Sequence, residues 1–207
     1  MFVFLKINTR FLIGFFLVIF SFFFFSFFNF VFALAETKVL SFKITEYEFW
    51  QKLSNNSYFV TGDQDTFIWT EESFSGDISL HVDIEGDAEN CEGVIILCGG
   101  GKGFSKHGLI FNIAHDFQSI RTYTFFSGMK YLVRGDRSVN FLKQKHKMSI
   151  KIVGNEALLF LDEEKILKTE LPANMRREGK IGLYKYKKRP EVTYSNIVLE
   201  LEGKIEN

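Results

Sequence analysis

Four residues in the middle of the chain have side chains suited to binding a polar, ring-shaped ligand: Trp69, Asn112, Arg121 and Tyr123. Aromatic rings pack against the apolar face of a sugar, and amide or guanidinium groups hydrogen-bond its hydroxyls. Asn112 is the polar break in the apolar stretch "GLIFNIA", and Arg121 and Tyr123 lie two residues apart in "SIRTYTF". We therefore predict that these four residues form a surface for a glycan or small saccharide.

These side chains share a surface only if the stretches that carry them are β-strands, in which residues two apart point to the same face. The sequence has this pattern in many places. In "GDISLHVDIEG", Ile78, Leu80, Val82 and Ile84 alternate with polar residues, which predicts a half-buried strand. The stretch "GVIILC" (93–98) is apolar throughout, as expected for a central strand of a packed sandwich.

About ten to twelve such stretches follow residue 36, separated by Gly, Asp and Asn. Gly154-Asn155 predicts a hairpin, because this dipeptide readily adopts positive φ between the β-rich runs "MSIKIV" and "EALLFL". No stretch has a sustained helical period, although residues 45–53, "TEYEFWQKL", could form a turn or two of helix. The pattern predicts an all-β sandwich or barrel.

The glycine-rich stretch "CGGGKGFSKHG" (98–108) raises the question of a phosphate-binding loop. Such a loop needs a strand, the motif G-x-x-x-x-G-K-[ST] and a helix whose amino end holds the anion. Here Gly103 follows Gly101-Lys102, Ile96 stands five positions before Gly101, and the next stretch is another strand. We predict a pliable connection between two strands.

The composition limits the class of partner. The chain has 207 residues, which is the length of one ordinary domain plus a leader. Its formal net charge is zero. A nucleic-acid partner normally leaves a basic footprint, and the sequence has none, so nucleic-acid binding is not predicted. The lysine-rich clusters at 143–147 and 185–189 are expected to be solvated strand edges and loop tips, where lysine also discourages edge-to-edge pairing.

Residues 1–35 read as a signal peptide or membrane anchor, and residues 36–207 as the β-sandwich domain. Lys6 and Arg10 precede a charge-free apolar run at 11–32, and Ala33 and Ala35 have the spacing of a cleavage site. The run is long enough to cross a bilayer, so an uncleaved anchor at 11–32 is the alternative. Either outcome predicts a secreted, periplasmic or cell-surface protein, with the membrane reached only through this segment.

Cys91 and Cys98 flank a predicted strand. Seven extended steps of roughly 3.3 Å put their Cα atoms about 20 Å apart, whereas a disulfide allows roughly 7 Å. We expect two buried or half-buried thiols. Two cysteines without a suitably spaced histidine also make a zinc site improbable, and we predict neither a metal nor a cofactor.

The strand and turn patterns resemble those of the concanavalin A-like lectin/glucanase superfamily. The stretches that carry the resemblance are "FIWTEESFSGDISLHVDIEG", "NCEGVIIL", "GLIFNIAHD", "MSIKIVGNEALLFLDEEKILKTE", "GKIGLYKY" and "TYSNIVLE". They look most like laminin G-like modules and the bacterial 3-keto-disaccharide hydrolase family, over roughly residues 41–203. The resemblance implies a jelly-roll β-sandwich of two antiparallel sheets, one of them curved, whose concave face or loop rim meets carbohydrate.

The sequence departs from the catalytic patterns of these relatives. Laminarinase-type members carry E-x-D-x-x-E on one strand, but "EGDAEN" has Glu85 and Asp87 with Asn90 in place of the second glutamate. The "YEVQILD" strand of the 3-keto-disaccharide family looks like "LIFNIAH", where Ile110 replaces the Glu and Asn112 the Gln. The catalytic residues, if the protein is an enzyme, stay unknown.

Two classes of function follow. The first is an exported, lectin-like carbohydrate-binding module without a catalytic pair. The second is a hydrolase or lyase of the 3-keto-disaccharide hydrolase type that acts on a modified disaccharide. The absence of a recognisable acid/base pair favours the first class.

Overall fold

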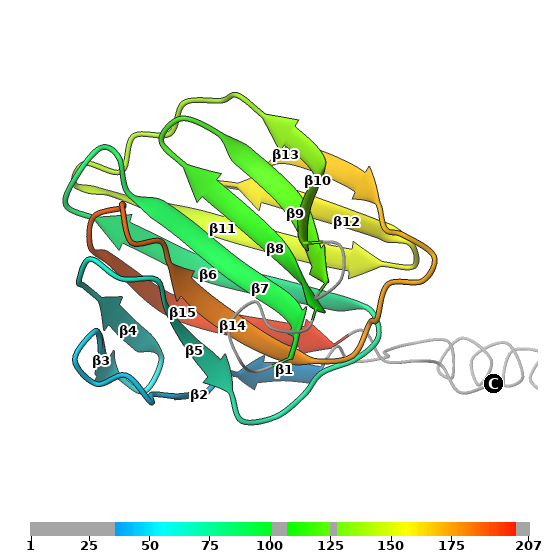
Figure 1. The fold of residues 1–207 in the computed structure, drawn as a ribbon, viewed down its shortest axis with the longest axis horizontal. Helices are drawn as coiled ribbons and strands as arrows, with labels where there is room; N and C mark the ends of the chain where they lie inside the picture. The colour runs from blue at the N-terminus through cyan, green and yellow to red at the C-terminus, as the bar shows by residue number, and fades with distance from the viewer. Residues whose placement is uncertain (1–35, 101–106, 125–127, 202–207) are drawn as a thin grey trace, which may run out of the picture.

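The computed structural model describes residues 36–100, 107–124 and 128–201, and this part of the chain is built from β-strands without a helix. Two antiparallel sheets pack face to face (Figure 1). The all-β sandwich predicted from the sequence is confirmed, and the jelly-roll description fits it. The predicted leader at 1–35 and the centre of the glycine-rich connection at 101–106 lie outside the described residues. None of the described residues forms a helix that could span a bilayer.

The sheet that we call sheet A has the order β13-β12-β11-β6-β15-β4-β3, and β1 also pairs with β15. Its strands are β1 (Glu36–Val39), β3 (Trp50–Ser54), β4 (Ser57–Val60), β6 (Ile78–Gly86), β11 (Gln144–Val153), β12 (Glu156–Leu161), β13 (Glu164–Glu170) and β15 (Val192–Leu201). The last strand in sequence, β15, therefore lies inside the sheet, between β6 on one side and β4 and β1 on the other.

The facing sheet, sheet B, has the order β10-β9-β8-β7-β14-β5-β2. Its strands are β2 (Phe42–Lys43), β5 (Thr66–Thr70), β7 (Glu92–Gly99), β8 (His107–Ala114), β9 (Gln118–Thr124), β10 (Gly128–Gly135) and β14 (Lys180–Lys185). In Figure 1 the strands of sheet B lie in front of sheet A; β7 and β8 are seen nearly face-on and β10 nearly edge-on, so the sheet curves.

The main hydrophobic core lies between the sheets and follows the predicted two-residue alternation. Ile78, Leu80, Val82 and Ile84 of β6 point into it, each at most 4% exposed. From the other side, β7 contributes Ile95 and its neighbours of like parity. Burying side chains of this size contributes roughly 1.5–3 kcal/mol each, which makes the alternation the main determinant of the fold.

Strand β7 is buried on both faces, as its uniform apolar sequence predicts. Its other face supplies Val94 and Ile96 to a second cluster, on the side of sheet B that points away from sheet A. We call that side the outer face. Near its end β7 bulges: Gly182 pairs with Ile96 but Lys180 pairs with Gly99, and Cys98 has a φ of 55°.

Two smaller predictions are confirmed. The Gly154-Asn155 turn joins β11 to β12, with Gly154 at a φ of 51°. Cys91 and Cys98 are both free and buried. Burial raises the pKa of the Cys98 thiol to about 11, with the nearby Arg177 and Arg176 opposing the shift.

Other expectations differ from the structure. Residues 45–53 form one turn, closed by hydrogen bonds from Phe49 N and Trp50 N to Glu46 O, both 3.0 Å, and then the strand β3. The cluster at 185–189 is not uniformly solvated. Lys185 is only 2% exposed and donates its ammonium to Gly62 O, and Arg189 forms ion pairs described below.

Candidate functional site

The outer face of sheet B brings the four predicted site residues to one surface. The pairing register sets one row of cross-strand neighbours: Trp69, Gly182, Ile96, Ile110, Arg121 and Tyr131. A second row contains Phe67, Tyr184, Val94, Asn112 and Ser119. Tyr123 lies two residues beyond Arg121, with the same parity.

The four residues are not equally close. Asn112 on β8 is paired with Ser119 on β9, so Asn112, Arg121 and Tyr123 lie on adjacent strands. Trp69 is four strand positions from Arg121 along its row, which is about 19 Å at a spacing of roughly 4.8 Å. The site therefore has a polar part near β8 and β9 and an aromatic part at β5 and β14.

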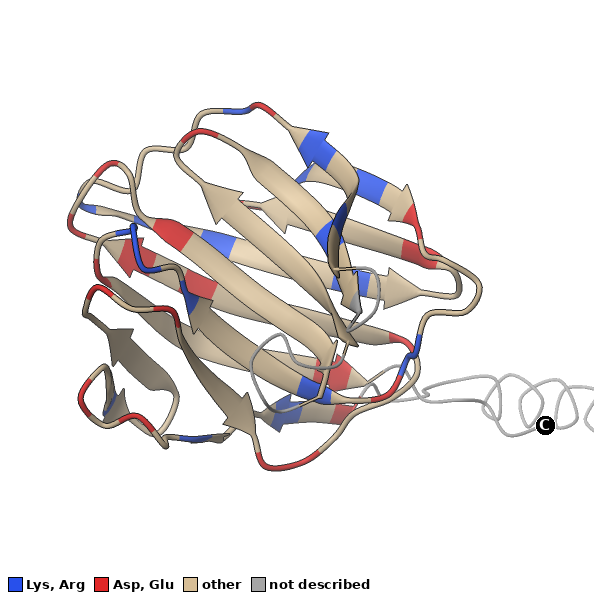
Figure 2. Ribbon diagram, viewed as in Figure 1, with Lys and Arg blue, Asp and Glu red and all other residues tan. Residues whose placement is uncertain are grey.

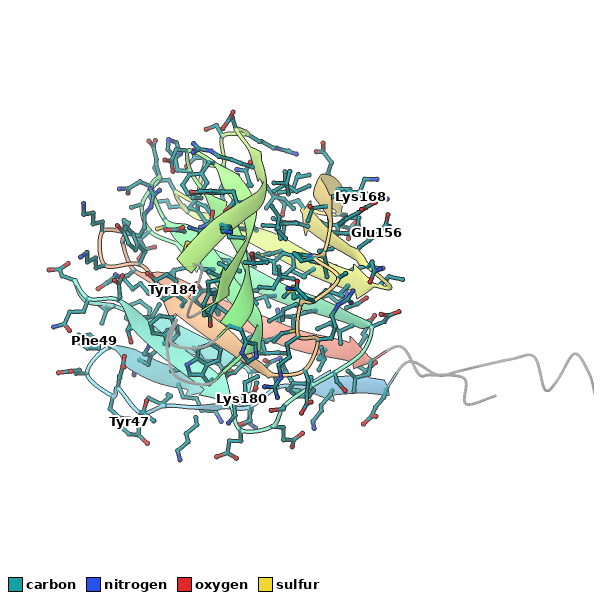
Figure 3. All side chains as sticks on the ribbon, turned by 45° about the vertical axis from the view of Figure 1, so that its right-hand side comes forward. Tyr47, Phe49, Glu156, Lys168, Lys180 and Tyr184 are labelled. Atoms are coloured by element: carbon teal, nitrogen blue, oxygen red, sulfur yellow. The ribbon has the colours of Figure 1, made fainter. Side chains whose placement is uncertain are left out.

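The aromatic part consists of rings that lie along the sheet. A Cβ built on Gly182 would come within 2.7 Å of the Trp69 ring, and one on Gly99 within 2.2 Å, so the indole covers both glycines. Phe67 lies beside Trp69, with centroids 6.1 Å apart and ring planes 7° apart. Tyr184 stacks on Phe67 at 4.6 Å and donates its hydroxyl to Asp65 Oδ1 at 2.8 Å. Figure 3 shows Tyr184 on β14 with Lys180 farther along the same strand.

The polar part is organised by Glu92, a carboxylate only 7% exposed at the start of β7. Asn112 donates its amide to Glu92 Oε1, and Arg189 donates its Nε to Oε2 at 3.2 Å. Arg189 also donates from Nη2 to Asp116 Oδ1 at 2.7 Å. The Arg189 guanidinium thus bridges the buried carboxylate of Glu92 and the exposed carboxylate of Asp116. By binding Oε2 of Glu92 it orients that carboxylate so that Oε1 faces the Asn112 amide.

The two carboxylates of this network have opposite pKa shifts. Burial raises the pKa of Glu92, although the positive charges of Arg189 and Arg121 oppose the rise. Slight burial also acts to raise the pKa of Asp116, but the hydrogen bond and positive charge of Arg189, together with a backbone hydrogen bond, outweigh it and the net shift is downward. Of the two groups, Glu92 is the one whose neutral form is favoured by its surroundings.

Three buried polar atoms of the outer face have no hydrogen-bond partner within the described residues: Asn112 Oδ1, Ser119 Oγ and Arg121 Nε. Asn112 and Ser119 are fully buried, whereas Arg121 is half-buried. An unsatisfied buried polar atom costs about 1–3 kcal/mol, so such atoms are rare in folded proteins. Three of them on neighbouring positions are well placed to bond the hydroxyl groups of a ligand.

The described residues contain no second buried carboxylate beside Glu92 and no group of three His, Cys, Asp or Glu side chains that could hold a metal ion. The segment "EGDAEN" ends β6 and forms the turn before β7, and its Glu85 pairs in register with Lys145 of sheet A. That segment therefore takes no part in the outer-face site.

Sequence reasoning missed Glu92, Ser119 and Arg189. Glu92 has the same parity as Val94 and Ser119 the same parity as Arg121, so strand alternation could have identified both. Nothing local identifies Arg189, because its partner Glu92 is 97 residues away in the chain.

The sequence matches no protein-family profile, and no curated protein matches it. Solved structures do match the fold. The carbohydrate-binding module CBM66 from Bacillus subtilis has a TM-score of 0.60 and 15% identity, over 81% of this chain and 97% of that one. A putative glycosyl hydrolase from Parabacteroides distasonis has a TM-score of 0.60 and 18% identity, over 80% and 99%. A β-glucanase from Bacillus licheniformis has a TM-score of 0.52 and 11% identity, over 81% and 97%.

These similarities confirm the resemblance to the concanavalin A-like superfamily at the level of fold. The matching proteins include both a binding module and proteins named as hydrolases. The fold alone therefore does not separate the two classes of function predicted from the sequence.

Proposed function

We propose that this concanavalin A-like sandwich is an exported carbohydrate-binding module that holds a glycan or small saccharide on the outer face of sheet B. The observation that carries the proposal is the combination of rings lying along the sheet with three unpaired polar atoms on adjacent strands. A sugar offers the matching surfaces, an apolar ring face and a set of hydroxyls. Similarity to a carbohydrate-binding module supports the assignment.

The polar groups have distinct roles in this proposal. Of the three residues Arg121 is the least buried, and its guanidinium donates a hydrogen bond to Met129 Sδ at 3.3 Å and lies 5.6 Å from the centre of the Tyr131 ring. Deeper in the face, Asn112 Oδ1 can accept a hydrogen bond and Ser119 Oγ can accept or donate one. Because both residues are fully buried, neighbouring side chains must move aside for a hydroxyl to reach them.

The test is a glycan array, followed by calorimetric titration of the best ligand. Arg121→Gln should weaken binding roughly tenfold, the effect of losing a charge-assisted hydrogen bond. The matched control is Arg137→Gln, because the Arg137 side chain pairs instead with Glu164 at 2.6 Å. An array with no bound glycan, or equal affinities for the two variants, would contradict the proposal.

A hydrolase or lyase of the 3-keto-disaccharide hydrolase type is the second candidate, and the raised pKa of buried Glu92 favours it. A carboxyl group whose proton is retained can act as a general acid. The assay is turnover of 3-keto-glycosides by the wild type and by Glu92→Gln. Turnover that Glu92→Gln abolishes would establish the enzyme, and absence of turnover together with glycan binding would establish the module.

Export is proposed from residues 1–35 alone. Carbonate extraction of membranes separates its two forms: a cleaved protein stays in solution, and one anchored by residues 11–32 stays in the pellet.

A further inference from the structure

A hollow of about 610 Å³ lies at one end of sheet B, where β8, β9 and β10 meet the loop between β13 and β14. Its lining includes His107, Tyr123 and Lys130 from the strands and Asn174 and Arg176 from the loop. Small-molecule sites typically enclose roughly 300–1,000 Å³, so this volume can hold a sugar residue. We call this space the rim hollow.

The rim hollow and the outer-face site share one residue, Tyr123. This residue belongs to the apolar cluster of the outer face and also lines the hollow. Gly108, on the neighbouring strand, allows this arrangement: a Cβ built there would come within 2.5 Å of the tyrosine ring. His107, Thr122 and Lys130, the other strand side chains that line the hollow, have the opposite parity to Arg121 and Tyr123, so they lie on the side of sheet B that faces sheet A. A saccharide on the outer face would reach the hollow around the ends of β8 and β9.

The lining of the rim hollow is basic. His107, Lys130 and Arg176 line it, and none of the described residues of the lining is an Asp or Glu. Lys130 is exposed and forms no ion pair among the described residues, and the carboxylate nearest Arg176, that of Glu178, is 3.9 Å away and exposed to solvent. Figure 2 shows Lys and Arg on β10 and on the loop that leads to β14.

Arg121, on the outer face of sheet B, carries a further positive charge. Its guanidinium contacts Met129 and Tyr131 and forms no ion pair with a described carboxylate. The Glu92 carboxylate nearby is already paired with Arg189. Arg121 and Lys130 thus carry positive charges that form no ion pair with a described carboxylate, and the pair of Arg176 with Glu178 is exposed to solvent.

We propose that the ligand is an acidic saccharide, and that its carboxylate or sulfate group occupies the rim hollow between Lys130 and Arg176. This inference rests on the proposed saccharide binding and names the chemical class of the sugar. Ammonium and guanidinium groups form short, charge-assisted hydrogen bonds with such anions, and guanidinium matches their geometry in a bidentate manner. A neutral sugar would leave Lys130 without an anionic partner and Arg176 with only the solvent-exposed Glu178.

The test compares acidic saccharides with matched neutral ones on the full protein. The probes are cellobiouronic acid with cellobiose, oligogalacturonate with its carboxyl-reduced form, and a sulfated galactose disaccharide with its desulfated form. We expect at least one acidic probe to bind roughly tenfold or more tightly than its neutral partner, with affinity falling as salt rises. The uronate and sulfate pairs distinguish the two anions.

Variants locate the anion. Lys130→Gln and Arg176→Gln should each weaken binding of the acidic probe roughly tenfold and leave the neutral probe unchanged. The control is Lys145→Gln, since Lys145 is an exposed lysine on β11 of sheet A, 3.9 Å from Asp83. Circular dichroism checks that each variant is folded.

The outcomes separate the two proposals. Neutral and acidic probes binding with equal affinity would overturn the acidic-saccharide inference and leave the proposed function standing. A preference for the acidic probe that survives both rim substitutions would overturn the placement of the anion in the rim hollow. Absence of binding to all six probes and to a broad glycan array would overturn the inference together with the proposed function.

Discussion

The contact between Trp69 and Gly182 allows a quantitative test of the aromatic part of the site. In Gly182→Ala the new methyl group would meet three ring atoms of Trp69 at 2.7, 2.8 and 3.0 Å. Comfortable carbon contacts are about 3.5–4.0 Å, so the ring must lift by about 1 Å. Gly182 has no positive φ, so alanine fits its backbone.

The expected change in stability follows from two opposing effects. Overpacking costs about 1–3 kcal/mol, and replacing a strand glycine by alanine returns about 0.4–1 kcal/mol through the unfolded chain. We expect the free energy of unfolding to fall by about 0.5–1.5 kcal/mol. Among the described residues no sheet covers the outer face, so the ring can move outward, which keeps the cost in the lower part of the overpacking range.

A double-mutant cycle with urea unfolding isolates the contact. In a Trp69→Ala background, Gly182→Ala should be neutral or stabilise by up to about 1 kcal/mol, because the ring that it strikes is absent. Fluorescence of the buried Trp50 and circular dichroism follow unfolding in all four proteins. Equal effects of Gly182→Ala in both backgrounds would refute the flat placement of Trp69.

Three further predictions concern buried groups. Burial raises the pKa of Glu92 above its ordinary 4.5. At pH values just above 4.5 the Glu92 side chain therefore keeps its proton in the folded protein, whereas the unfolded chain has lost it. The free energy of unfolding of the wild type should therefore fall, relative to that of Glu92→Gln, as pH rises through this window in urea titrations. Tyr194→Phe removes the hydroxyl that accepts a hydrogen bond from Val94 N at 3.0 Å and donates one to Tyr184 O at 2.9 Å; we expect a loss of about 1–3 kcal/mol in the same assay. Cys98 should resist alkylation by iodoacetamide at pH 8 in the native protein and react on unfolding, since burial raises its pKa to about 11; rapid native labelling would contradict its position.

The core and the outer face could be predicted because both depend on parity within single strands. Alternation in β6 identifies the core side, and the same rule places Asn112 on one face of β8 and Arg121 and Tyr123 on one face of β9. The register between strands then decides which of these residues are neighbours. That register is a tertiary property, which is why the distance of Trp69 from the other three was not foreseen.

Edge strands were the elements that the sequence left unpredicted. β3 and β10 lie at the edges of their sheets and are largely exposed, and β13 has few buried residues. A strand with little burial on either face needs no alternation of apolar and polar residues, so it has no periodic signal. Burial of Lys185 likewise depends on the Gly62 carbonyl, 123 residues earlier in the chain.

The position of β15 inside sheet A constrains when the protein can fold. Until its last residues are available, β13-β12-β11-β6 and β3-β4 have no strand to join them, and β1 has no partner. Pairing of Glu36 with Leu201 also requires the two ends of the domain to meet, which is a contact of very high sequence separation. Sheet A therefore stays incomplete while the chain is bound to the ribosome or only partly translocated. This delay in folding suits a polypeptide proposed to pass through a secretion channel before it adopts its native structure.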